Sequence, residues 1–255
     1  MRMFAGSYCG SPPSLAEVAT RWNFDPALLA VLALGLALSL RAGNRLATVG
    51  MALLAIAFVS PLCAASVTLF SARSLHHLLL ILGALCFAMA MRESEVSSRL
   101  ARSLFRRRVP VGPATIGMTA VLWGWHVPSL YDAALADMLV YWTMQLSILA
   151  SSFAFWLAIC RASAVGAVGG LLGGTVQMGF LSALLTFATE PLYRIHIAAA
   201  PSWGISPLAD QQLAGLIMWV GGMAPFAIGA AAIARNAWAR QNAAQPAPVV
   251  SRNPV

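Results

Sequence analysis

The chain has 255 residues, of which 60% are hydrophobic and only 9% are charged, and its formal net charge is +8. A soluble domain carries about a quarter charged residues, so this composition excludes an ordinary soluble protein. The apolar runs are long and unbroken rather than alternating, which excludes a transmembrane β-barrel and predicts an all-α polytopic membrane protein. All sixteen basic residues are arginines in short segments beside those runs, a pattern typical of membrane topology rather than nucleic-acid binding.

The chain divides into a short polar beginning, a long apolar domain and a polar tail. We predict an extracytoplasmic lead-in over residues 1–25, a seven-span transmembrane domain over residues 26–235 and a disordered cytoplasmic tail over residues 236–255. The seven predicted spans are residues 26–40, 47–63, 75–91, 113–127, 138–160, 165–188 and 207–234. Ser206 and Pro207 should begin the last span, and Pro225 should kink it.

Seven spans place the two termini on opposite sides of the membrane. If the N-terminus is outside, twelve of the sixteen arginines fall in the inner loops and the tail. The remaining four are assigned to outer segments: Arg2, Arg21, Arg73 and Arg194. Because inner loops are enriched in basic residues, this distribution predicts an N-out, C-in orientation.

The cysteines and the glycines of the sixth span indicate packing. The four cysteines are Cys9, Cys63, Cys86 and Cys160. No CxxC pair occurs, so neither a zinc knuckle nor a thioredoxin-like motif is predicted, and dispersed cysteines usually act as small apolar packing residues. Cys63 stands out because it ends the second span at the outer side. Two overlapping GxxxG pairs, Gly169, Gly170, Gly173 and Gly174, predict close helix packing inside the bundle rather than a homodimer interface.

The predicted topology brings all four histidines to the outer face. His76 and His77 open the third span, His126 ends the fourth, and His196 lies in the loop before the seventh. Ionisable groups at this depth are costly and often mark function. Together with Met144 they form the imidazole and thioether set that suits copper, especially the reduced ion. No HExxH, GxSxG or nucleotide-binding glycine pattern is present, and we predict no enzymatic turnover.

Ordinary structural roles compete with a metal site. An interfacial histidine is more often a hydrogen-bonded boundary residue than a ligand. His76 and His77 are adjacent on a helix and point about 100° apart, so at most one of them readily faces a shared centre. Asp210 follows a good helix start and is favourable near the positive end of the helix dipole.

Several segments together resemble the polytopic CtaG family of cytochrome c oxidase assembly factors, which are associated with caa-type oxidases. The segments are WNFDPALL (22–29), SLHHLLL (74–80), WHVPSLYDAAL (125–135), GFLSALLTFATEPLY (179–193) and ISPLADQQLAGLIMW (205–219). The resemblance covers residues 22 to 235. It implies a multi-pass protein of the bacterial plasma (inner) membrane that helps to mature haem-copper oxidases, with copper handled at the outer side.

The resemblance also implies site residues. His77 matches the second histidine of the family's HMxQH pattern, His126 and Asp132 match its WHxPxxYD pattern, and Asp210 and Gln211 match its LADQQxAGxxMW pattern. The chain departs from the family at two places. Arg73 and Ser74 replace the first histidine and methionine of HMxQH, with His76 in place of its glutamine, and Tyr141, Met144 and Gln145 occupy the positions of a common HxxEH pattern.

These observations predict a reduced copper site and a role in oxidase assembly. The expected ligands are His77 and His126, with His76 and Met144 as further candidates, in a cavity shaped by Asp132, Asp210 and Gln211. The expected partners are the lipid bilayer, cytochrome c oxidase subunits and copper chaperones, and no nucleic acid. Three alternatives stay open: a metal-free scaffold for oxidase assembly, a small-solute or ion transporter, and a carrier that holds haem between His77 and His126.

Overall fold

The described part of the protein is entirely helical. The structure is a computed structural model that describes residues 7–93 and 110–244, and no strand occurs within those two ranges. The long helices are α1 (Pro26–Arg41), α2 (Arg45–Val59), α4 (Phe70–Glu93), α6 (Val111–Trp125), α8 (Met138–Arg161), α9 (Ala164–Thr186) and α12 (Met223–Ala244). The shorter elements are η2 (Val18–Thr20), α3 (Leu62–Thr68), α7 (Pro128–Ala136), α10 (Arg194–Ile197), η3 (Ala200–Trp203), α11 (Pro207–Ile217) and η4 (Met218–Gly222).

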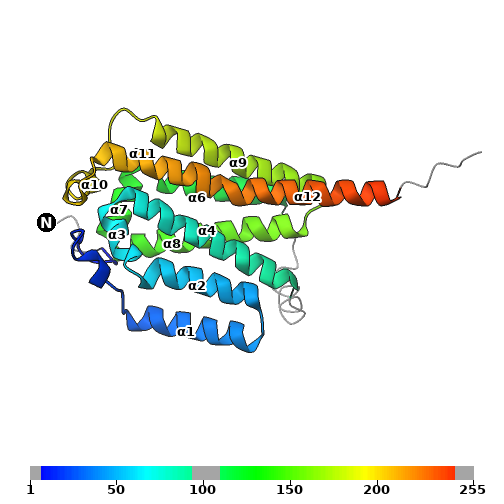
Figure 1. The fold of residues 1–255 in the computed structure, drawn as a ribbon, viewed down its shortest axis with the longest axis horizontal. Coiled ribbons are helices and arrows are strands. Elements are labelled where there is room, and N and C mark those ends of the chain that lie inside the picture. The colour runs from blue at the N-terminus through cyan, green and yellow to red at the C-terminus, as the bar shows by residue number, and fades with distance from the viewer. Residues whose placement is uncertain (1–6, 94–109, 245–255) are drawn as a thin grey trace, which may run out of the picture.

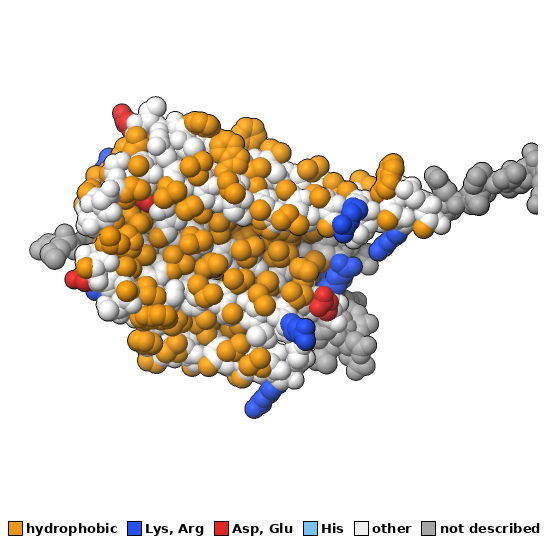
Figure 2. Space-filling model, viewed as in Figure 1, with side chains coloured by type: hydrophobic (Ala, Val, Ile, Leu, Met, Phe, Trp, Pro, Cys, Tyr) orange, Lys and Arg blue, Asp and Glu red, His pale blue; other side chains and the backbone are white. Residues whose placement is uncertain are grey.

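The helices form an elongated bundle with α4 and α8 at its centre. Figure 1 shows the long helices running in roughly the same direction, with α1 at one edge and α12 extending beyond the rest at one end. Helix α4 packs against α2, α8 and α11, while α9 packs against α11 and α12. The space-filling view has hydrophobic side chains over its middle and charged side chains towards its two ends (Figure 2). This is the surface expected of a membrane protein.

Each of the seven predicted apolar segments contains a helix, and several are long enough to cross a bilayer. Among the described residues, α4, α8, α9 and the continuous helix Pro207–Ala243 each qualify by length and hydropathy. Helices α2 and α3 would together make a fifth span, although they are bent by 50° at the break around Pro61. Helix α1 is apolar but shorter. The number of seven spans and the orientation stay predictions.

Local sequence signals set several helix starts. Asp25 accepts hydrogen bonds from the backbone N–H groups of Ala27 and Leu28, and Asn44 caps α2 in the same way. Ser206 accepts from the backbone N–H of Ala209, with Pro207 in the first turn of α11, as the sequence predicted. These side chains satisfy backbone donors that a helix leaves without an internal partner.

Two helix boundaries differ from the prediction. Helix α4 begins at Phe70 instead of near Leu75, so His76 and His77 lie inside the helix and not at its start. The last helix continues to Ala244, whereas the sequence predicted a span ending near Ala234 and a disordered tail after it. The part of the predicted tail beyond Ala244 lies outside the described residues.

The kink expected at Pro225 takes the form of a widened turn. The π-helical segment η4, Met218–Gly222, ends three residues before the proline. Proline lacks a backbone N–H and its ring collides with the preceding turn, and a π-helical turn relieves that conflict within a continuous helix. Helices α11 and α12 therefore continue one another through η4 (Figure 1).

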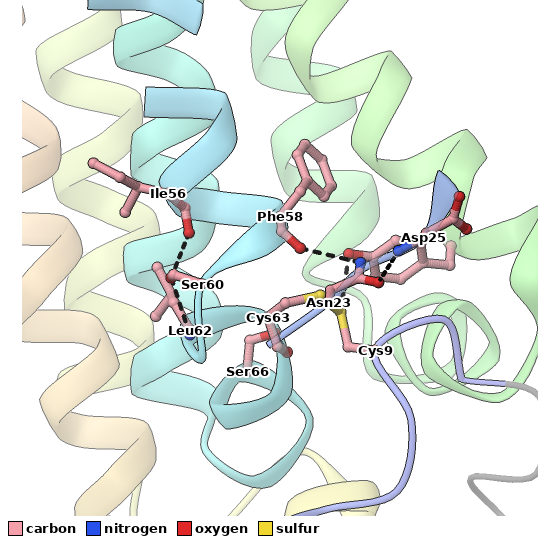
Figure 3. The surroundings of a disulfide bond; sticks show 10 residues. Cys9, Asn23, Asp25, Ile56, Phe58, Ser60, Leu62, Cys63 and Ser66 are labelled. Carbon is pink, nitrogen blue, oxygen red and sulfur yellow. Dashed lines mark hydrogen bonds between the residues drawn. A yellow bond between two sulfur atoms is a disulfide. The ribbon is translucent and has the colours of Figure 1, made fainter. Parts of the chain in front are cut away.

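The N-terminal segment is attached to the bundle by a disulfide. Cys9 and Cys63 are bonded, so for these two cysteines the predicted role of simple packing residues is wrong. Figure 3 shows the bond beside the start of α3, with Asn23 close by. The Asn23 amide donates to the carbonyl of Phe58 over 3.1 Å, and the ring of Tyr8 stacks on Tyr141 at 5.3 Å.

Glycines allow two helix pairs to approach closely. A Cβ atom at Gly174 would lie 2.8 Å from the Phe226 ring of α12, and one at Gly170 would lie 2.3 Å from the side chain of Val111 in α6. Two of the four glycines in the GxxxG pairs thus have the packing role predicted for them. In contrast, a Cβ at Gly169 would meet nothing within 4 Å.

The closest approach of backbones involves Gly215, and its replacement should destabilise the fold. A Cβ there would lie 2.8 Å from the Thr186 nitrogen and 2.9 Å from the Ser182 carbonyl oxygen of α9. Because backbone atoms cannot turn aside, Gly215→Ala should lower the free energy of unfolding by about 2 kcal/mol. Denaturant titration in detergent micelles would measure it. Gly169→Ala is the control and should be neutral or slightly stabilising; equal losses in both variants would contradict the prediction.

Candidate functional site

Six buried side chains lie on α4 and α8, two helices that pack against each other; of the six, Arg73 and Tyr141 are in contact across them, while the His76 ring packs against Phe58 of α2. From α4 come Arg73, His76 and His77, and from α8 come Tyr141, Met144 and Gln145; we call these six residues the α4–α8 cluster. The spacing is i, i+3, i+4 on both helices, which places each set of three on one face. None of the six is more than 6% exposed. His76, His77 and Met144 are thus all buried on two helices that pack together, and their joint action as ligands stays a prediction.

Most polar atoms of the α4–α8 cluster have no hydrogen-bond partner among the described residues. These buried atoms are the three nitrogens of the Arg73 guanidinium, both ring nitrogens of His76, Nε2 of His77 and both amide atoms of Gln145. Buried polar groups in folded proteins are nearly always paired. A concentration of unpaired groups in one place indicates a site that accepts something from outside the chain.

The sequence placed Arg73 in an outer segment before the third span. That boundary is wrong because Arg73 lies inside α4, while its assignment to the outer side stays a prediction. Its side chain is fully buried in α4, with Cζ 5.4 Å from the centre of the Tyr141 ring. The guanidinium is also within electrostatic reach of His76, His77 and the hydroxyl of Tyr131. The cause is the early start of α4, which takes Arg73 into the helix and turns it towards α8.

Asp210 explains that early start. Its carboxylate accepts hydrogen bonds from the backbone N–H of Phe70 over 2.6 Å, from the N–H of Ser71 over 3.1 Å and from the Ser71 hydroxyl. It thereby caps α4 from α11, and its negative charge is favourable at the positive end of the α4 dipole. The carboxylate is fully buried and directed at the backbone of α4 rather than at the histidines.

Asp132 and Gln211, the other two residues expected to shape the cavity, lie near the loops around α10. Gln211 accepts from the backbone N–H of Leu192 over 2.7 Å and so holds the segment after α9. Asp132 in α7 has one carboxylate oxygen buried without a hydrogen-bond partner in the described structure, and burial raises its pKa. Both are positioned to shape the end of the bundle, and neither is placed as a ligand beside His77.

His126 ends α6 with one ring nitrogen engaged. Its Nδ1 lies 2.7 Å from the carbonyl oxygen of Leu122, and a carbonyl can only accept, so Nδ1 carries the proton. The lone pair is therefore on Nε2, which is the form that binds a metal. The ring is within electrostatic reach of His77, and the hydroxyl of Tyr193 donates to the His126 carbonyl over 3.0 Å.

His196 differs from the other three histidines because both its nitrogens are engaged. Nδ1 lies 3.0 Å from the carbonyl of Thr68 and Nε2 lies 2.8 Å from the hydroxyl of Tyr131. The carbonyl fixes the proton on Nδ1, so Nε2 accepts from Tyr131. Burial lowers the pKa of His196 to about 3, which keeps the ring neutral at physiological pH. This histidine joins α3, α7 and α10 and has no free nitrogen for a ligand.

As placed, the candidate metal ligands do not form a closed centre. Within the described residues no group of three or more His, Cys, Asp or Glu side chains has a geometry that could hold a metal ion. The ring centroids of His76 and His77 are 5.9 Å apart, and the ring planes are inclined by 72°. His77 and His126, with Met144 as a sulfur donor, remain the candidate set.

An all-helical bundle with several apolar helices and a buried polar centre defines a polytopic membrane protein. A model of the cytochrome c oxidase caa3 assembly factor family matches residues 45–241, which run from the start of α2 into the last turn of α12. The chain belongs to that family, as its motifs indicated. Comparisons with curated proteins and with solved structures returned no match.

Sequence reasoning missed two features of the site. The burial of Arg73 had a visible signal, since an arginine occupies the place of a histidine in the family pattern three residues before His76. The disulfide also had one, because Cys9 and Cys63 were both assigned to the outer side, and paired cysteines are common in oxidising compartments.

Proposed function

We propose that this family member assists copper insertion into a haem-copper oxidase by holding a cuprous ion at the outer end of its bundle. His77 and His126 are the two principal ligands, with Met144 or His76 completing the set. The protein has no catalytic turnover in this role. Its site is in the plasma membrane of a bacterium, where it passes the ion between a copper chaperone and an oxidase subunit.

The observation that carries the proposal is the availability of donor atoms. Among the described residues, His77 Nε2 is buried without a hydrogen-bond partner, and the hydrogen bond from His126 Nδ1 leaves the lone pair of that ring on Nε2. Met144 is fully buried on the facing helix. Imidazole nitrogen and thioether sulfur are the ligands that favour reduced copper, and a cuprous ion accepts fewer ligands than zinc or a hard cation.

Two observations support placing this end of the bundle outside. The Cys9–Cys63 disulfide and His126 belong to the same end as the N-terminal segment, and disulfides persist in oxidising compartments such as the periplasm. Arginine side chains gather at the opposite end, where α12 leaves the bundle (Figure 2). Basic residues favour the cytoplasmic side, so both observations favour the N-out orientation.

A metal-free scaffold is the second candidate, and Arg73 favours it. The guanidinium is a permanent positive charge within electrostatic reach of His76 and His77, and it opposes the binding of a cation there. In that case the protein would support oxidase assembly through contacts with its subunits alone.

Titration with cuprous ion separates the two candidates. Purified protein in detergent, competing with a chromophoric cuprous chelator, should bind about one copper ion per chain, and His126→Ala should weaken binding by about tenfold or more. Met144→Leu should weaken it too, whereas Met118→Leu, at an equally buried methionine of α6, should not. A visible spectrum without a haem absorption band would dismiss the haem-carrier alternative.

Oxidase copper content in a deletion strain tests the function itself. The oxidase from that strain should be deficient in copper, and a gene carrying His126→Ala should fail to restore it. An oxidase with its full copper content in the deletion strain would contradict the proposal. Deficient oxidase that His126→Ala restores completely would instead establish the metal-free scaffold.

A further inference from the structure

We infer that the α4–α8 cluster binds a small monovalent anion, held by the guanidinium of Arg73. The inference does not depend on copper binding, because it follows from the charge and burial of one arginine. Arg73 is fully buried, and all three of its nitrogens lack a hydrogen-bond partner in the described part of the chain. A guanidinium keeps its proton in proteins, so the cost of burying its charge cannot be avoided by deprotonation.

The nearest protein groups do not neutralise Arg73. The Tyr141 ring lies 5.4 Å from the guanidinium carbon, and the hydroxyls of Tyr131 and Tyr141 are beside the guanidinium, but none of these groups carries a negative charge. Histidines at 76 and 77 carry no negative charge in any protonation state. Asp210 lies at the start of the same helix, but its carboxylate is already engaged by the backbone N–H groups of Phe70 and Ser71. A buried charge without a partner is strongly unfavourable, so a counter-charge from outside the chain is required.

The backbone adds to the positive potential. Arg73 is in the first turn of α4, and the N-terminal end of a helix carries a partial positive charge. The positive charge of an arginine is therefore unfavourable at that position, whereas the negative charge of Asp210 is favourable there. The potential at the cluster is therefore one that attracts an anion.

Two further donors belong to the same cluster as Arg73. The Gln145 amide nitrogen and a ring nitrogen of His76 are buried without partners in the described structure. Gln145 is one turn beyond Tyr141 on α8, and His76 is one turn beyond Arg73 on α4. Both helices thus contribute unpaired N–H groups to the cluster. A guanidinium binds a halide through one N–H or a carboxylate through two.

Because the cluster is enclosed, only a small anion can enter it. Each donor atom has almost no exposed surface, so an entering anion must shed its water and fit between two packed helices. Chloride and formate meet this requirement, whereas gluconate does not. An anion here would also cancel the repulsion that Arg73 exerts on a cation at His77.

The experiment compares anions at constant ionic strength. Copper-free protein in detergent is exchanged into sodium gluconate and titrated with sodium chloride or sodium formate while thermal unfolding is recorded. We expect a saturable rise in the unfolding temperature of several degrees, because a ligand that binds only the folded state stabilises it. Whichever salt acts at the lower concentration identifies the halide or the carboxylate as the preferred ligand.

Variants assign the effect to Arg73. In Arg73→Met, which removes the charge and keeps the length, the anion dependence should vanish. Arg194→Met, at an exposed arginine of α10, should retain it, and so should His126→Ala, which separates this inference from copper binding. A wild-type protein without saturable anion dependence, or an unchanged dependence in Arg73→Met, would overturn the inference.

Direct binding decides the matter if Arg73→Met does not fold. Equilibrium dialysis of the wild-type protein with radioactive chloride should then give about one bound ion per chain, displaced by formate and not by gluconate. Binding far below this stoichiometry for both anions would overturn the inference.

Discussion

Replacing Asp210 with alanine should lower the free energy of unfolding by about 3 kcal/mol, because three donors lose their acceptor at once. The carboxylate accepts from the backbone of Phe70 and Ser71 and from the Ser71 hydroxyl. All of these groups are buried, so water cannot replace the carboxylate. The first turn of α4 should fray, and the position of Arg73 should change with it.

The chain offers a matched control for Asp210. Asp137 caps α8, a helix of the same length as α4, and its carboxylate accepts from the N–H groups of Leu139 and Val140 over 2.8 and 3.0 Å. This cap is exposed and local, so Asp137→Ala should cost only about 1 kcal/mol. Denaturant titration of both variants would measure the difference. Equal losses of unfolding free energy in the two variants would contradict the prediction, because the buried cap at Asp210 would then contribute no more than the exposed cap at Asp137.

Removal of the disulfide should have the second large effect. Cys9→Ser should lower the free energy of unfolding by about 2–4 kcal/mol, because the bond restricts an unfolded chain whose two cysteines are 54 positions apart. The loss should also release Tyr8 from Tyr141 and Asn23 from the carbonyl of Phe58, which the bond keeps in place. The end of the bundle beside the α4–α8 cluster would become more open.

Reduction of the wild-type protein should reproduce the effect of Cys9→Ser, and it should have no further effect on that variant. Cys86→Ser is the matched control because Cys86 is a free cysteine, so this variant should keep wild-type stability. Alkylation followed by mass spectrometry should label Cys86 and Cys160 without reductant and should label Cys9 and Cys63 only after reduction. Labelling of all four cysteines in protein taken directly from membranes would refute the disulfide.

Much of the helical framework was predictable because its signals are local. A bilayer-length apolar run indicates a helix wherever it occurs, and Ser206 with Pro207 marked the start of α11 from adjacent positions. Gly170 and Gly174 were expected to pack closely because they recur one turn apart on α9, and Val111 and Phe226 fill the space beside them. The motifs at 74–80, 125–135 and 205–219 were sufficient to indicate the family that the comparison then confirmed.

The candidate site was only partly predictable. The sequence predicted that His76, His77 and Met144 lie in one region, because each is near the end of an apolar run and successive runs cross the membrane in opposite directions. It could not tell that His196 is fully engaged by Thr68 and Tyr131, because those partners come from two other elements. Whether His77 and His126 bind copper is still a prediction, and the titration above is the test.

Composition and apolar length thus determined that this protein is a helical membrane bundle, and its local motifs indicated the oxidase assembly family. Only the tertiary structure decided where α4 begins, because its cap is Asp210, which is 140 positions away from Phe70. The same cause buries Arg73, which the sequence had left in an outer segment. Cys9 and Cys63 likewise pair across 54 positions. Hydropathy and helix propensity are sums over neighbouring residues, whereas a cap, a disulfide and a buried charge depend on groups that meet only when the chain has folded.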